Sequence, residues 1–228
     1  MILHHLIGGE MGSADRPRGV IRLRGEEGAA PVLTRAAPQA RIRGRGQLQA
    51  NLNWLPAARA DLNLCALVEF RDGRATVVQA LGEDFGSLTQ WPYLALDHDD
   101  RTGGSSDGET LRVNLAHRER FARLLFFVYI YEGSADFRRL GATVDVTAPA
   151  GPGCRILLDD SPAGAQGCTI ASAVPDGDAL TVRREVNWYV PDGDRYVHEM
   201  IDRQYGFGLD WVRGTKPPRD GREAPRGI

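Results

Sequence analysis

The stretch Leu124-Leu125-Phe126-Phe127-Val128-Tyr129-Ile130-Tyr131 is the longest apolar run in this chain. A run of this length, with no polar alternation, is typical of a β-strand that is covered on both faces. We therefore expect it at the centre of a sheet. Neither this run nor any other approaches the roughly 18 apolar residues that a membrane-spanning helix requires.

Shorter strand-like segments precede and follow this run. Residues 47–55 and 179–190 alternate polar and apolar side chains, as strands with one buried face do. The cluster Arg71-Asp72-Gly73-Arg74 separates two such segments and favours a hairpin. Residues 117–123 favour one helical turn, and residues 195–205 a short helix. The other expected strands cover 62–70, 75–81, 93–96, 110–115, 142–146, 155–158 and 167–174.

Many short strands separated by Gly, Asp and Pro turns predict an all-β fold. The expected architecture is a β-sandwich of two facing, mostly antiparallel sheets, with a short C-terminal helix and flexible termini. The 228 residues, with 27 Gly and 13 Pro, suit one domain. We expect a basic, mobile N-terminal arm at 1–45, the sandwich at 46–214 and a disordered tail at 215–228.

The formal net charge of −2 is unevenly distributed. Residues 1–45 hold eight Arg against four acidic residues, whereas residues 46–212 hold 15 basic and 24 acidic residues. Basic arms can contact nucleic acid or anionic lipid, but soluble tails are the preferred interpretation. Aromatic residues do not interleave with Arg on a strand face as a single-strand nucleic-acid platform requires, so no direct nucleic-acid binding is expected.

The chain holds three cysteines, Cys65, Cys154 and Cys168, without a C-x-x-C pair. Cys65 and Cys168 lie in apolar strand-like runs, which favours buried thiols that behave as small hydrophobic side chains. A disulfide between Cys154 and Cys168 is disfavoured by the odd number of cysteines. The N-terminus lacks the basic start and long apolar block of a secretory signal, so we expect a cytoplasmic protein.

The loop from Leu96 to Glu109 carries more negative charge than a turn requires. Oxygen ligands on a flexible loop are what a calcium ion needs, yet Asp, Gly and Ser also favour ordinary solvated turns. The loop alone favours neither interpretation. A helix–loop–helix calcium site is excluded, because Arg101 and Gly108 fall at required ligand positions. The acidic residues of the loop are Asp97, Asp99, Asp100, Asp107 and Glu109.

Two more oxygen-bearing side chains, Asp61 and Asn63, open the strand expected at 62–70. Alternation places them on the same face of that strand. By themselves they are consistent with ordinary strand-edge polarity. Together with the acidic loop they would form a calcium site built from two segments.

Several motifs follow one another along residues 46–214. They are Asp61-Leu62-Asn63-Leu64, Val78-Gln79-Ala80-Leu81-Gly82 with Phe85-Gly86, Asp99-Asp100-Arg101-Thr102-Gly103, Gly108-Glu109, Ile130-Tyr131-Glu132-Gly133 and Tyr205-Gly206-Phe207-Gly208-Leu209-Asp210-Trp211. By these motifs the chain resembles the tellurium-resistance TerD-like superfamily, and especially its TerA branch. Several motifs in the right order are specific where a single acidic loop is not.

The resemblance implies a calcium-binding or scaffolding β-sandwich of the bacterial tellurite-resistance and stress-response system. It implies no established catalytic activity. It also implies sister proteins of that system as partners, with peripheral association with the inner membrane through them. The ligand motifs of the family carry over to Asp61, Asn63, Asp99, Asp100, Asp107 and Glu109.

Two departures from the family pattern weaken the expected calcium site. Asn63 stands where typical members have Asp, and the loop between Gly103 and Glu109 is shorter and poorer in acidic residues. Fewer carboxylates weaken calcium binding, so weak or single-site binding, or its loss, is expected. The alternative is a metal-independent protein-interaction subunit with a degenerate calcium site.

An enzyme that uses the acidic cleft is the third hypothesis, with Asp99 and Glu109 as an acid–base pair. The rest of the sequence does not favour it. His4 and His5 lie in the N-terminal arm, and the other three His residues are scattered. Neither a Gly-x-Ser-x-Gly elbow nor a phosphate-binding loop occurs. We therefore predict that the protein is not an enzyme.

Overall fold

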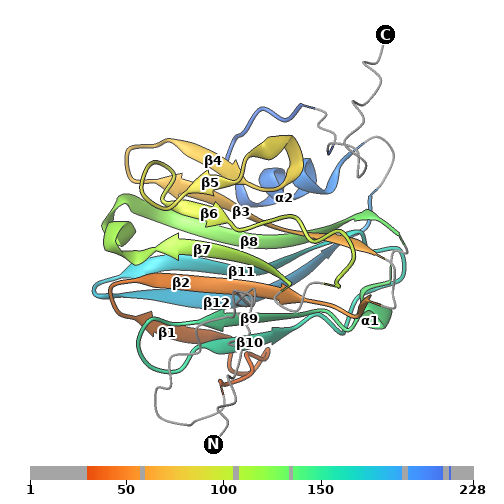
Figure 1. Ribbon diagram of the computed structural model, residues 1–228, viewed down its shortest axis with the longest axis horizontal. Helices are drawn as coiled ribbons and strands as arrows, with labels where there is room; N and C mark the ends of the chain where they lie inside the picture. The colour runs from red at the N-terminus through yellow and green to blue at the C-terminus, as the bar shows by residue number, and fades with distance from the viewer. Residues whose placement is uncertain are drawn as a thin grey trace, which may run out of the picture.

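A computed structural model of the chain describes residues 30–56, 60–104, 108–133, 136–191, 195–212 and 216. Two six-stranded sheets enclose an apolar core, and their strands run across the view in Figure 1. Every pair of neighbouring strands in the two sheets is antiparallel. The predicted all-β sandwich is therefore confirmed.

The first sheet contains the longest strands of the described residues. Its order is β1-β12-β11-β8-β3-β4. The strands are β1 (Gln39–Arg43), β12 (Ala179–Tyr189), β11 (Gly167–Asp176), β8 (Phe121–Glu132), β3 (Asp61–Phe70) and β4 (Ala75–Val78).

The second sheet has the order β10-β9-β2-β7-β6-β5. Alternation in β2 buries Leu48, Ala50 and Leu52 and leaves the polar residues between them partly exposed. The strands are β10 (Cys154–Leu157), β9 (Thr143–Thr147), β2 (Gln47–Asn53), β7 (Glu109–Asn114), β6 (Leu94–Leu96) and β5 (Gly86–Ser87).

The apolar run that contains Phe126 and Phe127 forms the middle of β8, between β11 and β3. Phe126 belongs to the core between the sheets, whereas Phe127 belongs to a second apolar cluster on the outer face. That cluster is covered by Val197 and Ile201 of helix α2 (Val197–Tyr205) and by Phe207. The prediction of a central strand covered on both faces is confirmed.

The remaining helical elements are short. They are η2 (Leu81–Glu83), η3 (Leu115–Arg120) and α1 (Phe137–Leu140). β4 ends at Val78, and η2 begins at Leu81. The strand expected over 75–81 is therefore shorter than predicted. η3 supplies the helical turn expected near 117–123 and begins two residues earlier, because the Asn114 side chain accepts a hydrogen bond from the Ala116 backbone N–H.

The ordered body begins before residue 46, where the sequence pattern places its start. β1 pairs with β12 at the sheet edge and buries Ile42 completely, and Leu33 is also buried. The strand is short and its exposed positions are occupied by Gln39, Arg41 and Arg43, so its pattern is too weak to recognise. The rest of the predicted arm, residues 1–29, lies outside the described residues, as does the predicted tail from residue 217.

All three cysteines are free and buried, which confirms the prediction of buried thiols at Cys65 and Cys168 and the disfavoured disulfide at Cys154. Burial raises the pKa of the Cys65, Cys154 and Cys168 thiols, so they remain protonated and unreactive. Within the described residues, no helix has the length and apolar character needed to cross a membrane.

Candidate functional site

Glu109, the first residue of β7, connects the acidic loop to β3. Its Oε2 accepts a hydrogen bond from the Leu64 backbone N–H at 2.6 Å, and its Oε1 accepts one from the Asp100 backbone N–H at 3.1 Å. The side chain is fully buried, and this burial raises its pKa well above the usual range. Glu109 therefore holds two distant segments together with its own carboxyl oxygens.

The loop after β6 is shaped by its own carboxylates. Asp97 Oδ1 accepts a hydrogen bond from the Thr110 backbone N–H at 2.9 Å and closes the base of the loop. Asp100 Oδ1 accepts from the backbone N–H groups of Thr102 and Gly103 and from the Thr102 hydroxyl, all at 3.0–3.1 Å. These side chains define the turn, as short acidic residues commonly do.

Gly103 is required at this turn because the chain passes directly over Trp54. Its φ is +68°, and a Cβ there would lie 2.6 Å from Trp54 Nε1. The Trp54 indole in turn donates a hydrogen bond to the Ala60 carbonyl oxygen, immediately before β3. The Thr-Gly motif thus fixes the loop against the start of β3.

Asp61 and Asn63 lie side by side at the start of β3, on the face that alternation predicts. Asn63 Nδ2 donates a hydrogen bond to Asp61 Oδ1 at 3.0 Å. Asn63 is fully buried, and its Oδ1 finds no hydrogen-bond partner. Asp107, the remaining residue of the predicted ligand set, lies outside the described residues.

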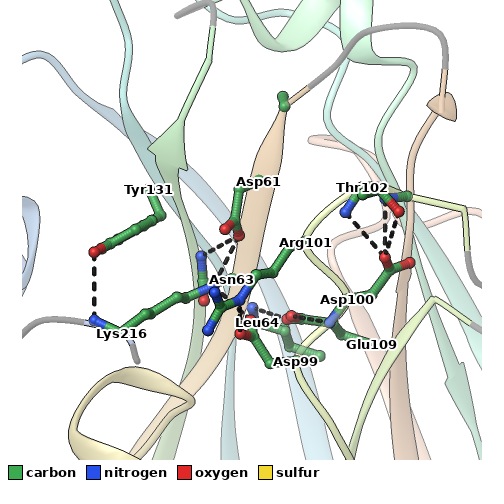
Figure 2. A network of polar contacts seen from close by, with 12 residues as sticks. Asp61, Asn63, Leu64, Asp99, Asp100, Arg101, Thr102, Glu109, Tyr131 and Lys216 are labelled. Atoms are coloured by element: carbon green, nitrogen blue, oxygen red, sulfur yellow. Dashed lines mark hydrogen bonds and ion pairs between the residues drawn. The ribbon is translucent and has the colours of Figure 1, made fainter. Parts of the chain in front are cut away.

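Lys216 places its ammonium group between the carboxylates of Asp61 and Asp99 (Figure 2). Its Nζ lies 2.8 Å from Asp61 Oδ1 and 2.5 Å from Asp99 Oδ1. The Lys216 and Asp61 side chains are each 1% exposed, and that of Asp99 is 15% exposed. Nζ also lies 5.0 Å from the Tyr131 ring centroid, and the Lys216 backbone N–H donates to the Tyr131 hydroxyl at 3.3 Å.

Arg101 supplies a second cation to the same cluster. Its Nε donates to Asp99 Oδ2 at 2.7 Å, and this ion pair raises the Arg101 pKa. Asp99 therefore lies between Arg101 and Lys216, and Lys216 also forms an ion pair with Asp61. Two carboxylates and two cations balance one another in a largely buried cluster, in which an uncompensated charge would be costly.

Burial sets the protonation of Asp61. Burial of the Asp61 carboxyl raises its pKa, while the hydrogen bond from Lys216 and the positive charge of Lys216 lower it. The net direction is upward, so the Lys216 ion pair offsets only part of the burial cost. Removal of the Lys216 charge would raise the pKa of Asp61 further.

The described acidic residues of the predicted ligand set each face a partner within the chain. Calcium takes six to eight oxygen ligands, but no group of three or more His, Cys, Asp or Glu in this part of the chain could hold a metal. Asp61 and Asp99 face ammonium and guanidinium groups, Asp100 faces the turn, and Glu109 faces backbone donors. The Lys216 ammonium occupies the position between carboxylates where a cation would be held.

The same contacts occupy Asp99 and Glu109, the pair considered for acid–base chemistry. Glu109 has no exposed surface through which a substrate could reach it. Asp99 is paired with two cations, one at each of its carboxylate oxygens. The cluster can link β3, the acidic loop and Lys216 by ion pairs.

Sequence reasoning did not identify Lys216 or Arg101 as members of the site. Arg101 lies inside one of the quoted motifs, but a single Arg beside several Asp residues does not by itself indicate an ion pair within the site. Lys216 falls in the segment predicted as a disordered tail, but its side chain is buried in the structure. One signal was present: Lys216 is the only lysine in a chain whose other cationic side chains, His aside, are all Arg.

Comparison with known proteins identifies a curated relative. The "Tellurium resistance protein TerA" of Alcaligenes sp. is 31% identical over 185 residues, which cover 75% of this chain and 53% of that protein. The chain thus spans about half the length of the curated relative that it matches. No family model matches the chain.

Comparison with solved structures gives two matches. The protein of unknown function SAV2460 matches with a TM-score of 0.51 and 19% identity, covering 66% of this chain and 93% of that one. A homologue of the telluride resistance protein TerD from Streptomyces coelicolor A3(2) gives a TM-score of 0.49 and 20% identity, covering 66% and 94%. On the sequence match to TerA, together with the sandwich fold, this chain belongs to the TerD-like family of tellurium-resistance proteins.

Proposed function

We propose that this chain is a non-enzymatic interaction component of the bacterial tellurite-resistance and stress-response system, and that it works without calcium. Its similarity to the TerA protein supports the placement in that system. The expected partners are sister proteins of the same system, in the cytoplasm, with peripheral association with the inner membrane through them.

The observation that carries the metal-independent part of the proposal is the position of the Lys216 ammonium. It lies within ion-pair distance of Asp61 and Asp99. A buried ammonium in that position repels a second cation and already neutralises the carboxylates that would bind it. The chain thus supplies internally the positive charge that calcium would supply from solution.

The absence of catalysis in this proposal rests on the same cluster. A general acid or base must come within hydrogen-bond reach of a substrate. Glu109 is fully buried and hydrogen-bonded to backbone N–H groups, and Asp99 is paired with two cations. These contacts favour a structural role for the acidic residues.

Calcium binding is retained as a second candidate because of one atom. Asn63 Oδ1 is a buried carbonyl oxygen without a hydrogen-bond partner, and it lies beside Asp61. A carbonyl oxygen of this kind is an acceptable calcium ligand. Displacement of the Lys216 ammonium by calcium would give this oxygen a partner.

Affinity purification distinguishes the two candidates. The tagged full chain is recovered from bacterial cells grown with sublethal tellurite, from parallel lysates that contain either EGTA or calcium chloride. Recovery of the same partner proteins from both lysates is the expected result. Loss of the partners in EGTA would contradict metal independence and favour the calcium candidate.

The role in resistance is tested separately by growth on tellurite. A strain that lacks the gene is expected to tolerate less tellurite, and the wild-type gene to restore tolerance. A matched Arg35→Met variant, which alters only an exposed ion pair with Asp160, is expected to restore it equally. Equal tolerance with and without the gene would contradict the proposed role.

A further inference from the structure

One end of the sandwich brings together several turns that are rich in Arg. The Arg71 backbone N–H donates to the Arg120 carbonyl oxygen at 2.9 Å. The Arg118 guanidinium donates to the carbonyl oxygens of Gly44 and Gly177, each at 3.3 Å. We call this region, at the left of Figure 1, the basic end. Its segments are 44–46, 71–74, 88–93, 176–178 and η3.

Four exposed Arg side chains at or beside the basic end have no acidic partner within the described part of the chain. They are Arg43, Arg45, Arg71 and Arg120. The acidic loop lies far away, because β3 runs from Asp61 beside that loop to Phe70 beside the turn at 71–74. A strand of ten residues spans about 33 Å, whereas the Debye length at physiological ionic strength is about 8 Å. The acidic loop therefore does not cancel the charge of these Arg side chains.

The acidic side chains at the basic end itself do not cancel it either. Two of the four, Asp72 and Asp176, are each paired with an Arg of their own. The other two are Glu119 and Asp178. A local excess of positive charge remains, in contrast to residues 46–212 as a whole, which hold 15 basic and 24 acidic residues.

Trp91 is the one large apolar side chain that the described segments of the basic end expose, at 40%. Its ring centroid lies 5.8 Å from that of Phe70 and 5.6 Å from the Arg74 guanidinium. The indole is thus anchored to the body on one side and open to solvent on another, with a cation beside it. Trp side chains in such mixed surroundings are typical of the boundary between a membrane and water.

These contacts narrow the class of partner. Bases of single-stranded nucleic acid stack on free aromatic faces, but the Tyr93 ring is already stacked on His117, with 4.0 Å between centroids. The Arg120 guanidinium also lies 5.3 Å from the Tyr93 ring centroid. A stable protein interface has an apolar core, which one exposed Trp does not supply. An anionic bilayer requires only cations and an aromatic side chain at its boundary.

We propose that the basic end contacts the surface of a lipid bilayer that contains anionic phospholipid. The guanidinium groups of Arg45, Arg71 and Arg120 pair with lipid phosphates, for which their planar donors are suited. Trp91 lies at the level of the headgroups. Without a lipid chain or an inserted helix, the contact is weak and reversible.

This contact is direct, whereas the proposed function assigns membrane association to partner proteins. Purified chain and pure lipid therefore test it without those partners. Its failure would leave the role in resistance and the metal independence as they stand, since neither depends on the residues of the basic end.

Flotation of the full chain with lipid vesicles measures the contact. The chain is expected to float with vesicles of equal parts phosphatidylglycerol and phosphatidylcholine, and to stay behind with vesicles of phosphatidylcholine alone. Because the attraction is electrostatic, binding is expected to be lost in about 1 M salt, where the Debye length falls to about 3 Å.

Two double variants locate the contact. Arg71→Gln/Arg120→Gln is expected to weaken binding to the anionic vesicles at least about tenfold, since each cation near the surface contributes about fivefold. Arg138→Gln/Arg139→Gln is the matched control, because it removes the same charge from α1, beyond the opposite end of β8. The control is expected to bind like the wild type, and circular dichroism verifies the folding of both variants.

Tryptophan fluorescence tests the orientation of the bound chain. Phosphatidylcholine brominated near the headgroup is expected to quench the wild-type protein on anionic vesicles. Trp91→Phe keeps an aromatic ring on Phe70 and is expected to lose most of this quenching, although three other Trp residues remain.

Four results would overturn the proposal. The first is the absence of binding to anionic vesicles, and the second is equal binding to both kinds of vesicle. The third is unchanged binding in Arg71→Gln/Arg120→Gln, which would assign the contact to other basic residues, such as those of 1–45. The fourth is complete displacement of the chain from the vesicles by duplex DNA at equal phosphate concentration, which would identify nucleic acid as the partner.

Discussion

The Lys216 ammonium lies 2.8 Å from the Asp61 carboxylate although 155 residues separate the two in the chain. Both side chains are almost completely buried. Neither charge would be stable there alone, since the desolvation of an isolated ion costs several kcal/mol. The pair therefore ties Lys216 to the first residue of β3 and gives the acidic cluster its missing positive charge.

Lys216→Met is expected to destabilise the protein by about 3–5 kcal/mol, because it leaves Asp61 and Asp99 without their shared cation. Urea unfolding followed by circular dichroism measures the loss. The double variant Asp61→Asn/Lys216→Met is expected to lose less than the sum of the two single changes. Arg35→Met, at an exposed pair, is the control and is expected to cost at most about 1 kcal/mol. A loss this small for Lys216→Met would contradict the buried ion pair.

Calcium is expected to leave the melting temperature of the wild-type protein unchanged and to raise that of Lys216→Met. Without the ammonium, Asp61 Oδ1, Asp99 Oδ1 and Asn63 Oδ1 would have no cation beside them, while Arg101 would still pair with Asp99 Oδ2. Thermal unfolding with calcium, with magnesium as a control, measures both proteins. The Asp61→Asn/Lys216→Met variant should lose the response. A calcium response in the wild type would refute the view that Lys216 takes the place of the ion.

His198 is expected to make the free energy of unfolding fall as the pH is lowered. Its pKa is about 4 in the folded protein and 6.5 in the absence of burial, so the unfolded chain binds more protons between these values. The stability present above pH 6.5 is lost progressively towards pH 4, by about 3 kcal/mol in total.

Urea unfolding over this pH range checks the prediction. The His198→Phe variant should lack this component of the slope. His117→Phe should keep it, because His117 lies elsewhere, stacked on Tyr93. Identical slopes for the wild type and His198→Phe would show that His198 is not the group responsible.

Asp202→Ala is expected to cost about 3 kcal/mol, because Asp202 accepts four hydrogen bonds and a buried donor without a partner is costly. The donors are the backbone N–H groups of Phe207, Gly208 and Leu209 and the Trp211 indole, each at 2.8 Å. Urea unfolding and tryptophan fluorescence measure the effect. The exposed Asp210→Ala is the control. An Asp202→Ala protein as stable as this control would show that the segment over α2 does not depend on the carboxylate.

Local sequence determined most of the secondary structure of this protein. Alternation in β2 and the continuous apolar run of β8 each specify which faces are buried, because the side-chain period of a strand is two residues. The acidic loop was likewise recognisable from its composition. β1 escaped recognition because so short a strand, with a single fully buried side chain among exposed Arg residues, has no clear period.

Only the tertiary structure decided what the acidic residues do. The sequence gathers Asp61, Asn63, Asp99, Asp100 and Glu109 as oxygen-bearing side chains, but it does not state whether an ion or another side chain faces them. Lys216 reaches them from a segment that shows no pattern of its own. Periodicity records burial along the chain, whereas an ion pair depends on which distant side chains the fold brings within a few ångströms of one another, and that distance is set by packing alone.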